Sequence, residues 1–106
     1  MARAEIFAGI CGFTTIVTTR MEGEKCRVTI EGGCNAIQKL ASELTLVDPY
    51  QEISARRSIP LTLQMGLKHC THAACPVPVG IIQAIEVEAH LALPKDVSIR
   101  LSKEGD

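Results

Sequence analysis

The sequence lacks tryptophan, has only one tyrosine and two phenylalanines, and carries no excess of charge of either sign. Its 11 basic and 12 acidic residues give a formal net charge of -1, and the basic residues are scattered along the chain. Nucleic-acid-binding proteins usually present a concentrated positive patch, or aromatic side chains on which bases stack. Because both features are missing, the sequence argues against a nucleic-acid partner.

Long apolar runs are also missing. A membrane-spanning helix needs about 20 apolar residues in succession, and the N-terminal segment Met1 to Ile6 lacks the apolar stretch of a secretory signal. We therefore expect a cytoplasmic protein with no membrane partner. With 46% hydrophobic and 22% charged residues in 106, the composition predicts one globular domain over residues 1–106.

Five cysteines are present, and an odd number without a secretory signal argues against a disulfide scaffold. Cys26 alternates with Val28 and Ile30 on the apolar face of a predicted strand, so we expect a thiol packed in the core. The other four lie in predicted loops or at the starts of predicted elements: Cys11, Cys34, Cys70 and Cys75. Their placement favours metal binding or thiol chemistry, and the packed-thiol alternative stays open for each of them.

A β-hairpin is predicted near the N-terminus. Residues 13–20 are dense in β-branched side chains, residues 25–31 alternate between apolar and polar, and residues 21–24 can turn the chain. Residues 5–8 can form a further short strand, which leaves Gly9 to Gly12 as the loop that enters the hairpin.

Helical patterns follow the hairpin. An apolar stripe with i, i+3, i+4, i+7 spacing follows Gly32-Gly33-Cys34 at Ile37, Leu40, Ala41 and Leu44. Asp48-Pro49 resembles the start of a short helix, and Ser58 and Pro60 can begin another through Leu67. The prolines after Cys75 mark the entrance of a long helix to about Leu91. We expect its buried face at Val79, Ile82, Ile85, Ala89 and Leu93.

After Pro94, the alternation of Val97, Ile99 and Leu101 with polar residues predicts a last strand. The predicted fold class is therefore α+β. A small, mainly antiparallel sheet, made of the hairpin and this C-terminal strand, is covered on one face by two main helices.

The densest group of ligand-type side chains is residues 69–76, which contain His69, Cys70, His72 and Cys75. Zinc prefers thiolates and neutral imidazoles as ligands, and iron–sulfur clusters prefer thiolates. The four-residue spacing between Cys70 and Cys75 is compatible with one metal but is less specific than paired Cys-x-x-Cys motifs. The positive end of the helix dipole favours the thiolate form of a cysteine at a helix start. We expect Cys34 and Cys75 to occupy such positions.

The order of these motifs resembles the iron–sulfur scaffold proteins of the IscU/NifU-N type. The resemblance rests on Gly-x-Cys-Gly before the hairpin, Gly32-Gly33-Cys34 after it, and Lys68-His69-Cys70 before the last helix. It implies a cluster or zinc ion held by Cys11, Cys34 and Cys70, with His69 adjacent. Phe13 stands where that family has an acidic residue.

Gly32-Gly33-Cys34-Asn35 and the later Cys70 and Cys75-Pro76 are also similar to the cysteine-rich TSCPD domain, although Ala73-Ala74 replace its Thr-Ser. That resemblance implies a thiol- or metal-binding module rather than an enzyme.

We therefore predict a metal-binding module for zinc or an iron–sulfur cluster, with candidate ligands Cys11, Cys34, Cys70, Cys75, His69 and His72. Two alternatives stay open: a thiol redox or sulfur-carrier protein, and a structural domain that binds a protein partner. The sequence contains no phosphate loop and no serine-histidine-aspartate order, so hydrolase or kinase chemistry has no support.

Overall fold

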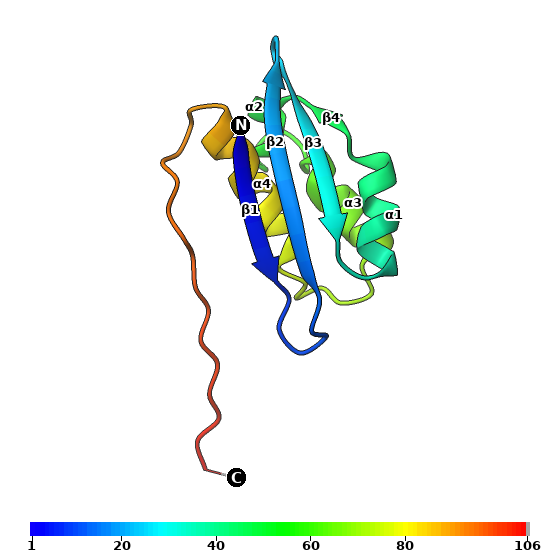
Figure 1. Cartoon of the computed structure of the whole chain (residues 1–106), viewed down its shortest axis with the longest axis vertical. Helices are drawn as coiled ribbons and strands as arrows, with labels where there is room; N and C mark the ends of the chain where they lie inside the picture. Colours follow the sequence, from blue (N-terminus) through cyan, green and yellow to red (C-terminus); the bar gives the residue numbers. More distant parts are fainter. Residues whose placement is uncertain (106) are drawn as a thin grey trace.

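The computed structural model describes residues 1–105, so Asp106, the end of the expected domain, lies outside the described residues. The elements follow in the order β1 (Ala2–Phe7), β2 (Thr14–Glu22), β3 (Lys25–Gly32), α1 (Asn35–Glu43), β4 (Leu46–Val47), α2 (Pro49–Glu52), α3 (Leu61–His69) and α4 (Val77–Glu88). The four strands form one antiparallel sheet in the order β1-β2-β3-β4 (Figure 1). The predicted α+β class and the predicted hairpin are confirmed.

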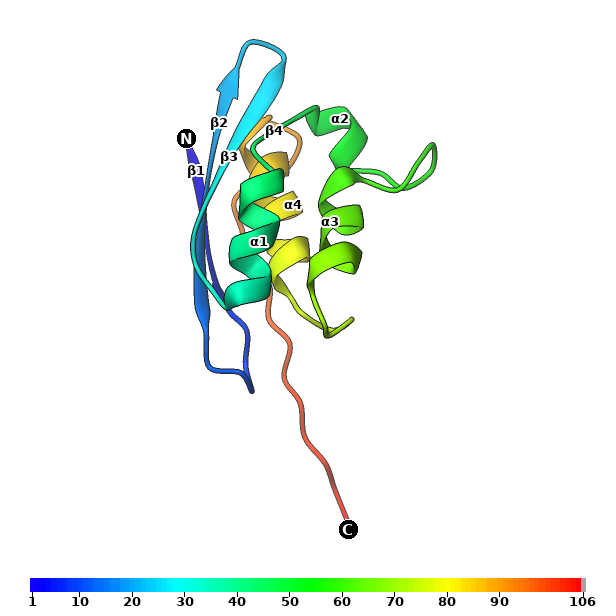
Figure 2. The ribbon, with the colours of Figure 1, turned by 90° about the vertical axis from the view of Figure 1, so that its right-hand side faces the viewer.

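The helices cover one face of the sheet and leave the other uncovered. Helices α1 and α4 lie against the strands, and α2 and α3 lie on the far side of these two helices (Figure 2). The buried strand side chains alternate as expected. The side chains that face the helices are Val17 on β2 and Cys26 and Val28 on β3. Cys26 is fully buried, which confirms its prediction as a core thiol.

Two consecutive glycines deliver the chain from β3 to α1. Gly32 and Gly33 both have positive φ, at 78° and 82°. A Cβ on Gly33 would lie 2.7 Å from Thr15 Oγ1 and 2.8 Å from Ile37 Cγ2, so a side chain has no room there. Because glycine has no Cβ, the chain can pass close to β2 and α1 here. This close approach places Cys34 at the N-cap of α1.

The N-cap residue of helix α3 is Pro60, which has no side-chain oxygen and cannot accept a capping hydrogen bond. A buried carboxylate from α2 takes this role. Glu52, only 3% exposed, accepts hydrogen bonds from Leu61 N at 3.0 Å, Thr62 N at 2.7 Å and Thr62 Oγ1 at 2.6 Å. Helix α2 is itself capped by Asp48, as predicted, through a 3.0 Å bond from Tyr50 N.

The expected buried face of α4 was correct at Ile85 but wrong at both of its ends. Val79 is 52% exposed and Leu93 lies beyond the helix. The buried residues of the helix are Val77, Pro78, Gly80, Ile81, Ala84 and Ile85. The helix is apolar on nearly every side, so periodicity alone could not select the face. Glu88, near the end of the helix, accepts a 3.0 Å hydrogen bond from Met21 N.

Helix α4 also ends earlier than predicted, at Glu88 rather than Leu91. His90 takes a positive φ of 62°, and the chain closes with bonds from His90 N to Val87 O at 3.2 Å and from Leu91 N to Glu86 O at 2.9 Å. This pair of bonds is a Schellman motif, a common helix end. It turns the chain out of the helix toward the C-terminus.

The predicted last strand is not present. Residues 92–105 contain no strand or helix, and every one of them is exposed. The alternating pattern of Val97, Ile99 and Leu101 is a strand pattern, but a strand needs a neighbour and no described strand pairs with this segment. We call residues 92–105 the C-terminal arm. It accounts for the long dimension of the molecule and ends far from its body (Figures 1 and 2).

Candidate functional site

The loops that carry the candidate cysteines meet at one end of the molecule. The β1–β2 turn, the start of α1 and the α3–α4 connection all lie at the lower end in Figure 1. We call this region the cysteine end. It contains Cys11 in the turn, Cys34 at the N-cap of α1, Cys70 at the C-cap of α3, and Cys75 one residue before the N-cap of α4.

Three of these thiols are brought together. Cys34, Cys70 and Cys75 are partly buried and pack against the hydrophobic core. Burial, followed by the nearby thiols of Cys75 and Cys34, raises the pKa of the Cys70 thiol to about 11. The Cys70 thiol therefore lies close to those of Cys75 and Cys34. All of these cysteines are free thiols.

The raised pKa bears on the predicted thiol chemistry. A reactive thiol is usually one whose pKa lies below about 8.5, because the thiolate is the nucleophile. The shift of Cys70 has the opposite direction. Cys70 is thus a protonated thiol at neutral pH in the metal-free protein, and it cannot supply the low-pKa nucleophile that a sulfur carrier needs.

Cys11 is placed differently. Gly9 and Gly12 both have positive φ, and a 2.8 Å bond from Gly12 N to Gly9 O closes a turn that leaves Ile10 and Cys11 at its tip. Cys11 is exposed. It lies at the cysteine end, but it does not pack with the other three thiols. Cys11 itself is therefore not a packed thiol.

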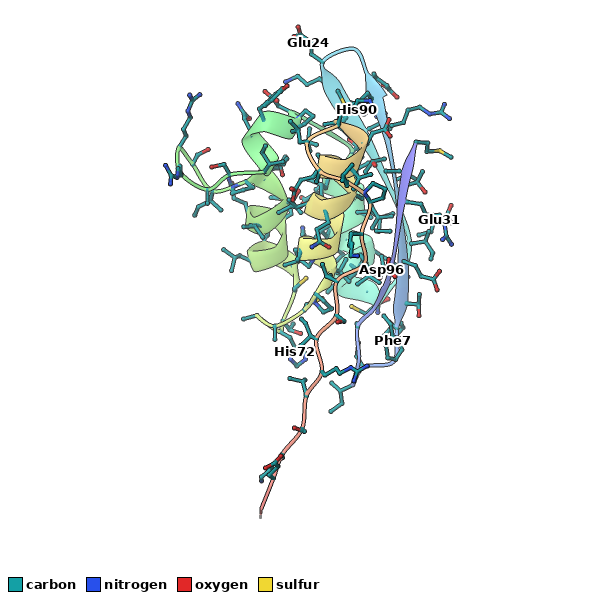
Figure 3. The ribbon with its side chains drawn as sticks, turned by 90° about the vertical axis from the view of Figure 1, so that its left-hand side faces the viewer. Phe7, Glu24, Glu31, His72, His90 and Asp96 are labelled. Carbon is teal, nitrogen blue, oxygen red and sulfur yellow. The ribbon has the colours of Figure 1, made fainter. Side chains whose placement is uncertain are left out.

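The two histidines do not join the thiols. His69 is the last residue of α3, and its Nε2 pairs with the carboxylate of Glu43 on α1, which also pairs with Lys68 at 2.9 Å. These partners lower the pKa of Glu43, first through His69 and then through Lys68. The pairs join α1 to α3 beside Cys70. His72 is exposed in the α3–α4 connection (Figure 3).

Sequence reasoning missed two features of this end. One is Glu43, whose pairing with His69 depends on how α1 and α3 pack. The other is a group of exposed apolar side chains around the Cys11 turn: Phe7, Ile10 and Phe13. Large apolar residues beside a glycine turn were a usable signal, because such residues in a loop have no core to enter.

Within residues 1–105, no group of three or more His, Cys, Asp or Glu side chains is arranged to hold a metal ion. Among the same residues, no helix is long and apolar enough to cross a membrane.

The fold and this end of the molecule define a small α+β protein with a cluster of free thiols where three chain segments meet. The chain belongs to a family of unknown function (DUF6951), whose model matches residues 2–101. No curated protein and no solved structure matches the chain. The resemblances to the IscU/NifU-N and TSCPD families stay predictions.

Proposed function

We propose that this protein is a small cytoplasmic metal-binding module that holds zinc or an iron–sulfur cluster through Cys34, Cys70 and Cys75. The supporting observation is the meeting of three free thiols at one end of the fold, one from the start of α1 and two from the α3–α4 connection. Thiolates are the preferred protein ligands of both zinc and iron–sulfur clusters. The proposed class is a binding module rather than an enzyme.

Electrostatics supports a cation at this place. Each thiol must lose its proton before it binds a metal, and three thiolates close together repel one another. Part of the rise in the Cys70 pKa comes from this repulsion, through the charges of Cys75 and Cys34. A bound divalent cation would turn this repulsion into attraction and would displace the Cys70 proton.

A tetrahedral zinc site needs a fourth ligand. Cys11 is the first candidate, because it is an exposed thiol in a turn at the same end. His69 would have to give up its pairing with Glu43, and His72 would have to turn in from solvent. We therefore place Cys11 ahead of both histidines.

Anaerobic purification followed by metal analysis and an absorption spectrum tests the proposal. We expect about one zinc per chain, or the brown colour of an iron–sulfur cluster, and loss of the metal on replacing Cys34, Cys70 or Cys75 by Ala. Cys26→Ala is the matched control, because this core thiol lies outside the cluster and its loss should leave the stoichiometry unchanged. A folded, metal-free protein that neither binds added zinc nor responds to a chelator would contradict the proposal.

A reversible disulfide between Cys70 and Cys75 is the second candidate function. The closeness of these two thiols favours it, because Cys75 contributes to the raised pKa of Cys70 and the two residues flank one short connection. The two thiols would lose two protons and two electrons to a low-molecular-weight disulfide, which is reduced to two thiols. Oxidised glutathione should then lower the chain mass by two hydrogens in the native protein, and Cys70→Ala should abolish that product.

A further inference from the structure

The sheet has an unpaired edge. Strand β1 pairs with β2 on one side, and no described strand pairs with its other side. The backbone N–H and C=O groups on that side are available to another strand. The inward side chains of β1, Ala2 and Ile6, are buried under α4, so a strand added at this edge would extend an existing apolar layer.

The C-terminal arm carries the complementary pattern. Val97, Ile99 and Leu101 share one side of an extended chain, and they are 64%, 79% and 91% exposed. Ser98 and Arg100 lie on the opposite side. Three branched apolar side chains in water are costly unless something covers them, and their alternation fits a strand with one buried face. The family model extends to residue 101, so it includes this pattern to its end.

Beyond β1, the flank of α4 offers an apolar surface for that buried face. Gly80 contacts Ile6 of β1, because a Cβ on Gly80 would lie 2.3 Å from Ile6 Cδ1. The helical repeat places Val87 next to Gly80 on the side away from α3, followed by Gln83 and Val79. Val79 is 52% exposed, and Gln83 and Val87 are partly exposed.

The chain's own arm does not fill this flank. Ala92, Leu93 and Lys95 border a hollow of about 130 Å³ together with α4, and Leu93 stays exposed. The arm then continues beyond the lower end of the body of its own molecule (Figures 1 and 2).

We propose that residues 97–101 of one molecule add as a strand to the free edge of β1 in a second copy of this chain. The same residues of the second copy pair with β1 of the first. The exchange is closed and two-fold symmetric, so it stops at a dimer. In it Val97, Ile99 and Leu101 cover the α4 flank of the partner, and both exposed edges gain hydrogen bonds.

Light scattering after size exclusion tests the dimer on the full chain, in the presence of a thiol reductant so that disulfides do not contribute. We expect a mass of twice the 11.4 kDa of one chain. Ile99→Lys should give a monomer, because the inward side chain becomes charged. Ser98→Lys, one residue away on the outward side, should stay a dimer. A monomeric native protein, or a dimer that survives Ile99→Lys or is lost equally with Ser98→Lys, would overturn the proposal.

Isotope-filtered NMR on mixed samples separates exchange between molecules from docking within one chain. A ¹⁵N-labelled chain is mixed with a ¹³C-labelled chain, unfolded and refolded together. We expect contacts from the β1 amides of one chain to the Ile99 and Leu101 methyl groups of the other. Contacts found only within one chain would show that the arm docks on its own sheet, and would overturn the exchange.

Discussion

The buried carboxylate of Glu52 should be one of the most sensitive positions in the fold. It provides the acceptors for the start of α3, which ends at His69 and Cys70. Replacing Glu52 by Ala removes all three hydrogen bonds at once. The amide and hydroxyl of Thr62, which is fully buried, would lose their partners, whereas the amide of Leu61 is near enough to the surface to find water.

A buried donor without a partner costs about 1–3 kcal/mol. Two such donors on Thr62 predict a loss of about 2–6 kcal/mol for Glu52→Ala. Glu52→Gln keeps one carbonyl oxygen for Thr62, but its NH₂ group would face the amide of Leu61, so we expect about 1–2 kcal/mol. Since a domain of this size has a free energy of unfolding of about 5–15 kcal/mol, the Ala variant should melt on the order of 10 °C or more below the native protein.

Urea unfolding followed by far-ultraviolet circular dichroism measures these differences. Thr62→Val is a second variant for this assay, because it removes only the hydroxyl partner of the carboxylate. The Glu52→Gln and Thr62→Val effects should not add, since both side chains belong to one hydrogen-bonded group. Glu52 does not cap α3 in the way described if Glu52→Ala lies within about 0.5 kcal/mol of the native protein, the range of an ordinary surface substitution, or if the Gln variant is as unstable as the Ala variant.

Three further predictions concern single groups. Thr15 Oγ1 is buried and has no hydrogen-bond partner among the described residues, so Thr15→Val should raise the free energy of unfolding by about 1 kcal/mol. Thr19→Val removes the 3.0 Å bond to Ala84 O and should lower the free energy of unfolding by about 1 kcal/mol in the same urea assay. His90→Gly should stabilise the protein by about 0.5–1 kcal/mol in thermal unfolding, because glycine accepts the positive φ at this helix end, and His90→Ala should give no gain. The pKa of Cys70 near 11 in the folded, metal-free protein exceeds the ordinary thiol value, so the unfolded chain loses this proton first. The stability that Cys70 contributes is therefore complete below about pH 8.5 and is lost as the pH rises toward 11. Cys70→Ser should show a smaller loss over that range, and an unchanged slope of unfolding free energy against pH would contradict the burial argument.

The fold could be predicted from the sequence wherever one local pattern determined one local structure. The alternation around Cys26 and Val28 fixed a buried strand face, and Asp48-Pro49 marked the start of α2. The buried face of α4 could not be predicted, because several sides of this helix are apolar and only the position of the sheet selects among them. The cap of α3 by Glu52 was likewise invisible, since it joins two elements across the loop of residues 53–60.

The loops that form the candidate site could be predicted from the sequence, but the thiols that come together in it could not. The sequence placed the candidate thiols in loops, and the order of strands and helices then brought those loops to one end. Which thiols touch was set by packing: Cys70 and Cys75 flank the α3–α4 connection and meet Cys34 at the start of α1. The strand predicted from the alternation of Val97 to Leu101 was wrong, because a strand also needs a neighbour and no described strand pairs with these residues.

The proposed metal site and the proposed dimer rest on different residues, so each provides a control for the other. Ile99→Lys changes the arm and leaves Cys34, Cys70 and Cys75 in place, so it should give a monomer that still binds about one zinc per chain. Cys70→Ser should lose zinc and stay a dimer under reducing conditions. If Ile99→Lys also lost zinc, the metal site would need the second molecule. If Cys70→Ser became monomeric, the association would depend on the cysteine end rather than on the edge of β1. The two variants, measured together for mass and zinc content, therefore decide whether metal binding and association are separate properties of this fold.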